Sequence, residues 1–156
     1  MNLRAGVAGA GAMGRNHARV FSLLEGVELV AIYDQNKQQA EAIAAEFGAI
    51  AVDSLDEFAE AVDAATVAVP TIAHREVGCA LMEKGVHVLM EKPIADTLDD
   101  ARVLIETSQR CGKILQVGHI ERFNPVMREL EDRLSEPRFI EAHRLSPFPN
   151  RSIDIG

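Results

Sequence analysis

The stretch Gly9-Ala10-Gly11-Ala12-Met13-Gly14 decides the fold of this chain. It follows a short apolar run at residues 3–8 and precedes a stretch with helical periodicity. Three glycines at this spacing suit a turn between a strand and a helix. The first permits a tight turn, the second lets the backbone approach a pyrophosphate, and the third lets the helix pack closely on the strand. The pattern predicts a dinucleotide-binding turn, although on its own it also occurs in turns without a ligand.

The residues after the turn predict a helix whose N-terminus would direct free N–H groups and the positive end of its dipole at phosphates. Helical spacing predicts one buried stripe on this helix. Its members are His17, Val20, Phe21 and Leu24. Gly26 is expected to end the helix.

Asp34 follows a second apolar run, at residues 28–33, and lies 20 residues past Gly14. An acid at this distance is expected to hydrogen-bond the hydroxyls of the adenosine ribose. The alternative is a capping or turn role before the helix that starts near Asn36. A carboxylate here would repel a ribose 2′-phosphate, and the only nearby cation is Lys37, so NAD is favoured over NADP.

The composition is that of an ordinary globular protein with one full core: 156 residues, 47% hydrophobic and 26% charged. A net charge of −8 argues against binding to nucleic acid or to an anionic membrane. We find neither a signal peptide nor an apolar run of membrane-spanning length, and expect a cytoplasmic protein. Cys79 and Cys111 are expected to be reduced thiols, and the histidines and cysteines show no metal-ligand spacing, so no metal is expected.

Strand and helix patterns alternate six times. Strands are expected at 3–8, 28–33, 49–52, 64–69, 86–90 and 114–117. Between them, residues 54–57 predict a capping box, helices are expected from 71 or 72 to 84 and from 98 onward, and Leu98, Ala101, Leu104 and Ile105 should face inward. This alternation predicts a doubly wound parallel α/β sheet, the Rossmann fold, of order 3-2-1-4-5-6.

Ligands of such sheets bind beyond the carboxyl ends of the strands. The residues expected at those ends are the glycine turn, Asp34, Pro70-Thr71, Glu91-Lys92-Pro93 and Gly118-His119. We expect them to share one cleft.

Four stretches resemble the Gfo/Idh/MocA oxidoreductases. They are GAGAMGRNH at 9–17, VPTIAH at 69–74, GVHVLMEKP at 85–93 and GHIERFNP at 118–125. Their order and spacing are those of the family, and EKP after the fifth strand is the most specific of them. The resemblance implies NAD(P)-dependent oxidation or reduction of a sugar or polyol.

The resemblance also implies roles for residues of the cleft. It places Gly9, Gly11, Ala12, Met13, Gly14, Asp34, Pro70, Thr71, Glu91 and Lys92 at the cofactor. Lys92 would contact the substrate and the nicotinamide ribose and take part in proton transfer, as its catalytic residue; the alternative is a solvated lysine beside a turn proline. Glu91 would orient Lys92 or cap locally.

Three further residues have two possible roles each. His74 either acts in the site or bonds to backbone at the start of a helix. His119 and Arg122 are candidates for substrate contact, and the alternative for Arg122 is a surface ion pair with Glu121 or Glu129.

We expect a dinucleotide-binding domain at 1–120 and, at 121–156, the beginning of a substrate and oligomerisation domain that is incomplete. A helix from Asn124-Pro125 would turn Val126, Leu130 and Leu134 inward. A strand at 137–145 with Phe139, Ile140 and Ala142, and a loop at 146–156, would follow. Family members continue into a further domain with an Asp/His motif and the catalytic base, so we expect a partial chain that forms a homo-oligomer through the part that follows.

The stretch at 118–125 is similar to that of members which oxidise the 3-hydroxyl of UDP-N-acetylglucosamine-type nucleotides. The resemblance thus implies a sugar or sugar-nucleotide dehydrogenase. The alternative is a non-catalytic NAD-binding regulatory or scaffold module, which would not need Lys92. A methyltransferase that uses a glycine turn for S-adenosylmethionine fits the third glycine and the strand order less well.

Overall fold

The structure is a computed structural model that describes residues 2–131, 136, 138–141 and 143. Contacts divide the chain into two units, Met1–Gly118 and His119–Gly156. Each unit is described by itself below.

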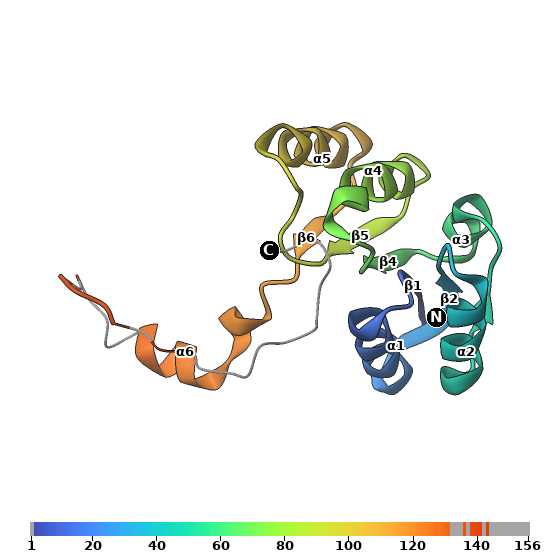
Figure 1. Cartoon of the computed structure of the whole chain (residues 1–156), viewed down its shortest axis with the longest axis horizontal. Coiled ribbons are helices and arrows are strands. Elements are labelled where there is room, and N and C mark those ends of the chain that lie inside the picture. Colours follow the sequence, from blue (N-terminus) through green and yellow to red (C-terminus); the bar gives the residue numbers. More distant parts are fainter. Residues whose placement is uncertain (1, 132–135, 137, 142, 144–156) are drawn as a thin grey trace. The chain divides into compact units, whose positions relative to one another are not determined.

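The first unit contains a six-stranded parallel sheet (Figure 1). Its strands are β1 (Leu3–Ala8), β2 (Val27–Tyr33), β3 (Ile50–Ala51), β4 (Ala64–Val67), β5 (His87–Met90) and β6 (Leu115–Val117). Their order, β3-β2-β1-β4-β5-β6, confirms the prediction of a doubly wound sheet. Four strands are shorter than expected: β3 has only two residues, β4 ends two residues before Val69, and β5 and β6 each begin one residue later.

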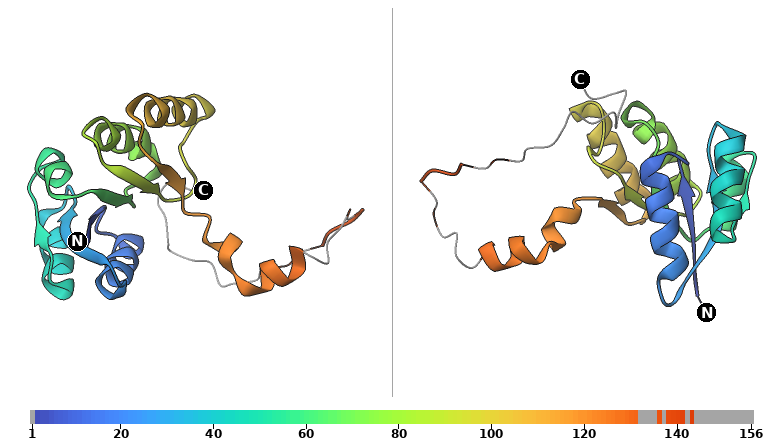
Figure 2. Two further views of the ribbon diagram at one scale, coloured as in Figure 1. Left: turned by 180° about the vertical axis from the view of Figure 1, so that it is seen from behind. Right: turned by 60° about the horizontal axis from the view of Figure 1, so that its bottom comes forward.

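Helices cover both faces of the sheet. They are α1 (Ala12–Leu23), α2 (Lys37–Phe47), α3 (Leu55–Ala61), α4 (His74–Glu83) and α5 (Leu98–Cys111), with a 3₁₀ turn, η1 (Thr71–Ala73), before α4. Figures 1 and 2 show α1 and α2 side by side. Side chains alternate between the layers, so Ile32 packs with α1 and α2, whereas its neighbour Ala31 packs with the layer of α3, α4 and α5.

Helices α2, α3 and α5 begin at capping side chains. Asn36, Ser54 and Thr97 each accept a hydrogen bond from a backbone N–H three residues on, at 3.1–3.3 Å. The capping box at Ser54 differs in one detail, because the Glu57 carboxylate accepts from the N–H of Asp53 at 3.1 Å and not from that of Ser54.

The predicted buried stripe of α1 is partly wrong. Gly14 and Ala18 are its buried residues, whereas Val20 is 45% exposed and Leu24 is 51% exposed. Small residues face the sheet because α1 lies too close to it for larger side chains. The helix also ends at Leu23, before Gly26.

The inward face of α5 is likewise narrower than predicted. Leu104 is fully buried, but Leu98 is 78% exposed and Ile105 is 45% exposed. The helix packs chiefly on α4 and has few contacts with strand β6, so a single row of side chains is covered.

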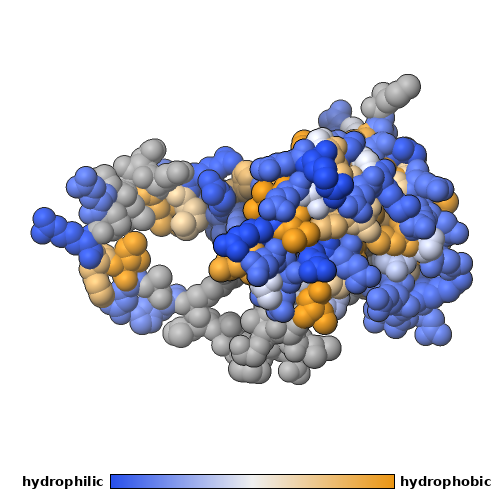
Figure 3. Space-filling model, turned by 90° about the horizontal axis from the view of Figure 1, so that it is seen from above, coloured by the Kyte–Doolittle hydropathy of each residue, from blue (hydrophilic) through white to orange (hydrophobic). Residues whose placement is uncertain are grey.

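On the face seen in Figure 3, apolar and hydrophilic residues are interspersed.

The second unit contains a 3₁₀ turn, η2 (Ile120–Phe123), and helix α6 (Pro125–Glu131). The prediction that α6 turns Val126 and Leu130 inward is wrong for these residues, which are 64% and 37% exposed. Among residues 136, 138–141 and 143 the structure has no strand, and Phe139 and Ile140 are exposed. Leu134, Ala142 and the predicted loop at 146–156 lie outside the described residues.

Candidate functional site

The first and third glycines of the turn are required by packing. Gly9 has φ +102°, a conformation that L side chains rarely adopt, and a Cβ there would lie 2.5 Å from the backbone carbonyl of Ala68. A Cβ on Gly14 would press against the carbonyl oxygen of Gly9, closer than real Cβ contacts come. These two glycines let α1 start directly on the end of β1.

The second glycine faces open space. A Cβ on Gly11 would meet nothing within 4 Å. Gly11 is the N-cap of α1, no side chain caps the helix, and its first turn carries no acid. Ala12 and Met13 are exposed beside it. The helix N-terminus is therefore left open to an anion, and the turn fits the pyrophosphate of a dinucleotide.

Asp34 links the end of β2 to the glycine turn. Its Oδ2 accepts a hydrogen bond from the N–H of Ala10 at 2.6 Å, and its Oδ1 accepts one from the N–H of Asn36 at 2.7 Å. The turn role that the sequence left open is therefore present, and the same bond brings the carboxylate beside the turn. Each oxygen retains accepting capacity for a ribose hydroxyl. Lys37 pairs with Asp53 at 2.6 Å.

Glu91 and Lys92 follow β5 at the same edge of the sheet. The Glu91 N–H donates to the carbonyl of Val67 at 3.0 Å, and the Lys92–Pro93 peptide bond is cis. The Glu91 side chain is 10% exposed, and its Oε2 accepts from the N–H of Lys92 at 3.1 Å. Lys92 itself is exposed, and within the described residues its side chain has no hydrogen bond or ion pair.

Sequence reasoning missed the role of His17. We expected it to pack in the buried stripe of α1, but its Nε2 lies 2.8 Å from Oε1 of Glu91. The two side chains are 74 positions apart, so periodicity could not pair them. The only signal was that both belong to the stretches that carry the family resemblance.

His74 bonds to backbone, the second of its two predicted roles. It is 1% exposed. Its Nδ1 lies 3.0 Å from the carbonyl oxygen of Pro93, and its Nε2 lies 3.1 Å from that of Val69. Pro70 is exposed between these segments, and Thr71 opens η1 with 8% exposure.

His119 and Arg122 belong to the second unit. His119 precedes η2 and Arg122 lies within it, and both residues are exposed. Their contact with substrate stays a prediction.

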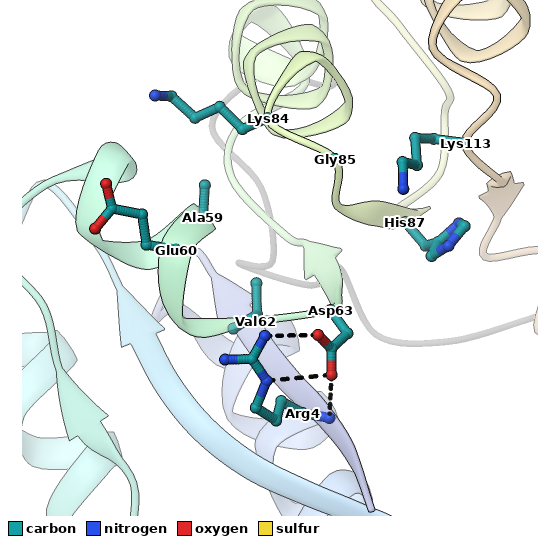
Figure 4. A pocket seen from close by; sticks show the side chains of 9 residues that line it. All are labelled: Arg4, Ala59, Glu60, Val62, Asp63, Lys84, Gly85, His87 and Lys113. Atoms are coloured by element: carbon teal, nitrogen blue, oxygen red, sulfur yellow. Dashed lines mark hydrogen bonds and ion pairs between the residues drawn. The ribbon is translucent and has the colours of Figure 1, made fainter.

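Two hollows lie in the first unit. One, of about 420 Å³, borders the glycine turn between α1 and α2, and includes Gly11, Ala12 and Gln39. The other, of about 410 Å³, lies at the opposite edge of the sheet (Figure 4). Its lining includes Arg4, which holds Asp63 in a bidentate pair, and Lys84 at the C-terminus of α4. A lysine there complements the helix dipole, and ligands of such sheets bind at the other edge, so we assign no site to this hollow.

Among the described residues there is no group of three or more histidines, cysteines or acids that could hold a metal ion. Cys79 and Cys111 are free and half-buried. In the part of the chain that the structure describes, no helix has the length and apolarity needed to cross a bilayer.

The parallel sheet, the open glycine turn and the acid at the end of β2 define a dinucleotide-binding α/β domain. The family model described as "Oxidoreductase family, NAD-binding Rossmann fold" matches residues 3–119. The chain belongs to this Gfo/Idh/MocA oxidoreductase family, and its cofactor is NAD.

Several relatives are similar to most of the chain. UDP-N-acetylglucosamine 3-dehydrogenase of Acidithiobacillus ferrooxidans is 36% identical over 99% of this chain and 49% of its own length. Its solved structure has a TM-score of 0.91 and matches over 99% of this chain and 51% of that one. Inositol 2-dehydrogenase 1 of Saccharopolyspora erythraea is 36% identical over 80% of this chain and 39% of its own.

A solved structure in complex with NAD, GenD2 from gentamicin A biosynthesis, is 28% identical and has a TM-score of 0.81. It matches over 85% of this chain and 38% of its own. The chain thus spans about half the length, or less, of the curated relatives it matches.

Proposed function

We propose that the protein transfers a hydride between NAD and a secondary alcohol of a sugar or sugar nucleotide. The observation that carries this proposal is the pairing of two features at one edge of the sheet. The glycine turn with Asp34 lies at the ends of β1 and β2, and the Lys92 loop lies at the end of β5. A cofactor held by the first would extend along the edge that carries the second.

The roles of the residues follow from their contacts. The amide groups at the start of α1 would bind the pyrophosphate, and Asp34 would accept from the adenosine ribose hydroxyls. Pro70 and Thr71 would border the nicotinamide half, and Glu91 would contribute through the backbone of its loop, because its carboxylate already has two partners. NAD is preferred to NADP, since Lys37 is paired with Asp53 and a 2′-phosphate would meet the Asp34 carboxylate.

The bound nicotinamide supplies the hydride acceptor. The exposed Lys92 amine would then contact the substrate hydroxyl and take part in moving its proton. We propose Lys92 as the catalytic residue of this chain, and His119 and Arg122 as substrate contacts.

For the substrate we propose a UDP-N-acetylglucosamine-type nucleotide oxidised at the 3-hydroxyl. Support comes from the similarity to the dehydrogenase of that name over 99% of the chain. We also propose a cytoplasmic protein that forms homo-oligomers. Exposed apolar side chains in the second unit, among them Ile120, Phe123 and Val126, support association.

Calorimetric titration with NAD, NADP and S-adenosylmethionine tests the cofactor. We expect heat from NAD, weaker binding of NADP and none of S-adenosylmethionine. Reduction of NAD in the presence of UDP-N-acetylglucosamine tests the substrate, with myo-inositol as the competing polyol. Lys92→Met should weaken NAD binding about tenfold, the loss of one charged contact with the nicotinamide ribose, and lower turnover at least about a hundredfold, the scale of a lost acid–base group. These assays use the protein with any residues that follow Gly156. If it binds NAD but turns over neither substrate, the result would favour a non-catalytic NAD-binding regulatory module over a dehydrogenase.

A further inference from the structure

Lys92 is exposed, and none of the other residues that the structure describes fixes its side chain by a hydrogen bond or an ion pair. A long unbranched side chain in this state loses considerable conformational entropy when it is placed against a ligand. Where its amine can reach then depends on how rigidly its backbone is held. The residues on either side of Lys92 therefore control where its amine lies in the proposed reaction.

On the N-terminal side, Glu91 is the link. One carboxylate oxygen accepts from the Lys92 N–H at 3.1 Å, and the other lies 2.8 Å from Nε2 of His17. Both side chains are largely buried, with 10% exposure for Glu91 and 15% for His17. A buried carboxylate without its partner would be costly, so His17 keeps Glu91 turned inward and bonded to the loop.

On the C-terminal side, His74 holds the loop independently. Its ring nitrogens lie against the carbonyl oxygens of Pro93 and Val69, which belong to the loops after β5 and β4. The backbone of Lys92 is thus fixed from both sides. Of these two contacts, the one made by His17 comes from helix α1, whose N-terminus forms the dinucleotide turn.

We propose that His17 is a positioning residue, which acts through Glu91 to hold Lys92 at a fixed distance from the dinucleotide turn. The His17–Glu91 contact joins the helix that would receive the pyrophosphate to the loop that would receive the nicotinamide half. The two parts of the site then stay in register when the cofactor binds. This inference rests on the proposed function, because register matters only if one ligand spans both parts.

The test compares His17→Leu with His17→Gln. Leucine has similar bulk but cannot donate to Glu91, whereas the glutamine amide carries N–H donors at about the reach of Nε2. Each variant of the protein is titrated with NAD and with ADP, which has the adenosine and pyrophosphate but no nicotinamide riboside. Hydrogen exchange of the Lys92 amide, measured by NMR, reports on the bond to Glu91.

We expect His17→Leu to bind NAD roughly tenfold more weakly, the effect of losing one hydrogen bond to a charged group, while ADP binds as in the wild type. The Lys92 amide should exchange faster by a similar factor. His17→Gln should restore both. Equal loss of NAD and ADP would overturn the inference, since it would indicate damage to the turn itself. Unchanged NAD binding and amide exchange in His17→Leu, or no rescue by glutamine, would also overturn it.

Glu91→Met provides a second route if His17→Leu does not fold. Methionine keeps the length of the side chain but has no carboxylate oxygen to accept from His17 or from the Lys92 N–H, so NAD binding should weaken and ADP binding should not. Unchanged binding of both ligands would again contradict the inference. Failure of the wild type to bind NAD or ADP would instead reject the proposed function, and the amide exchange of Lys92 would still decide whether His17 holds the loop.

Discussion

The glycine turn and the Lys92 loop lie at the same edge of one sheet but are built in different ways. The turn is shaped by the absence of side chains: Gly9 and Gly14 allow close backbone approach, and Gly11 leaves open space. The loop is held by side chains from elsewhere in the chain, His17 on α1 and His74 at the start of α4. The glycine turn is thus specified by consecutive residues, whereas the Lys92 loop depends on contacts between residues far apart in the sequence, which form only when the chain folds.

The largest effect is expected from Gly14→Ala. The added methyl would press against the carbonyl oxygen of Gly9, and backbone cannot move aside as a flexible side chain could. We expect a loss of about 3 kcal/mol or more in the free energy of unfolding. Urea denaturation measures it.

Gly11→Ala is the matched control, since the same methyl would meet no atom within 4 Å. The free energy of unfolding should change by no more than about 0.5 kcal/mol. NAD affinity should nevertheless fall, because the methyl would occupy the space offered to the pyrophosphate. Wild-type affinity for NAD in this variant would argue against phosphate binding at the turn.

The next largest effect is expected at Asp34, whose carboxylate bonds to the glycine turn. Asp34→Ala should weaken NAD binding by roughly 1–3 kcal/mol, the scale of a lost charged hydrogen bond, and relax the discrimination against NADP. Calorimetry with both cofactors measures it. Asp53→Ala, which removes another acid and frees Lys37, should leave NAD affinity unchanged. Equal affinities of the Asp34 variant and the wild type for both cofactors would rule out the ribose role.

A substitution within strand β4, away from both the glycine turn and the Lys92 loop, should alter stability without altering NAD binding. Thr66 in β4 is fully buried, and its hydroxyl has no hydrogen-bond partner among the described residues. Thr66→Val keeps the shape and removes the unsatisfied group, so the protein should become about 1 kcal/mol more stable. Thermal unfolding tests this, with an unchanged NAD affinity as the control. A less stable variant would mean that the hydroxyl is satisfied in solution.

The smallest effect lies at the opposite edge of the sheet. Hydrogen bonds from Arg4 lower the pKa of the exposed Asp63 carboxyl. Because the folded pKa is below the unfolded one, the pair stabilises the protein above the ordinary aspartate pKa of about 4, and this contribution is lost as the pH falls through the lower folded value. Asp63→Asn should therefore be slightly less stable than the wild type at pH 7 and equally stable in strong acid. NAD affinity should not change. A stability difference that is independent of pH would show that the carboxylate charge is not its cause.

The sequence predicted much of the first unit because its signals are local. The glycine turn at residues 9–14, the capping box at residues 54–57 and the apolar strands each depend on interactions within a few residues. The alternation of strand and helix patterns was enough to predict the strand order. Burial on the helices was predicted less well. Val20 and Leu98 have the right spacing but are exposed, since periodicity gives the direction of a side chain and not the presence of a neighbour to cover it.

The sequence by itself therefore determined the doubly wound sheet, the dinucleotide turn and the position of Asp34 at the end of its strand. Only the tertiary structure decided that Asp34 bonds to the turn, that His17 and Glu91 meet, and that His74 is buried against two carbonyl groups. The physical reason is separation along the chain. Hydrogen bonds between residues 24 and 74 positions apart form only when the strands have brought their carboxyl ends to one edge.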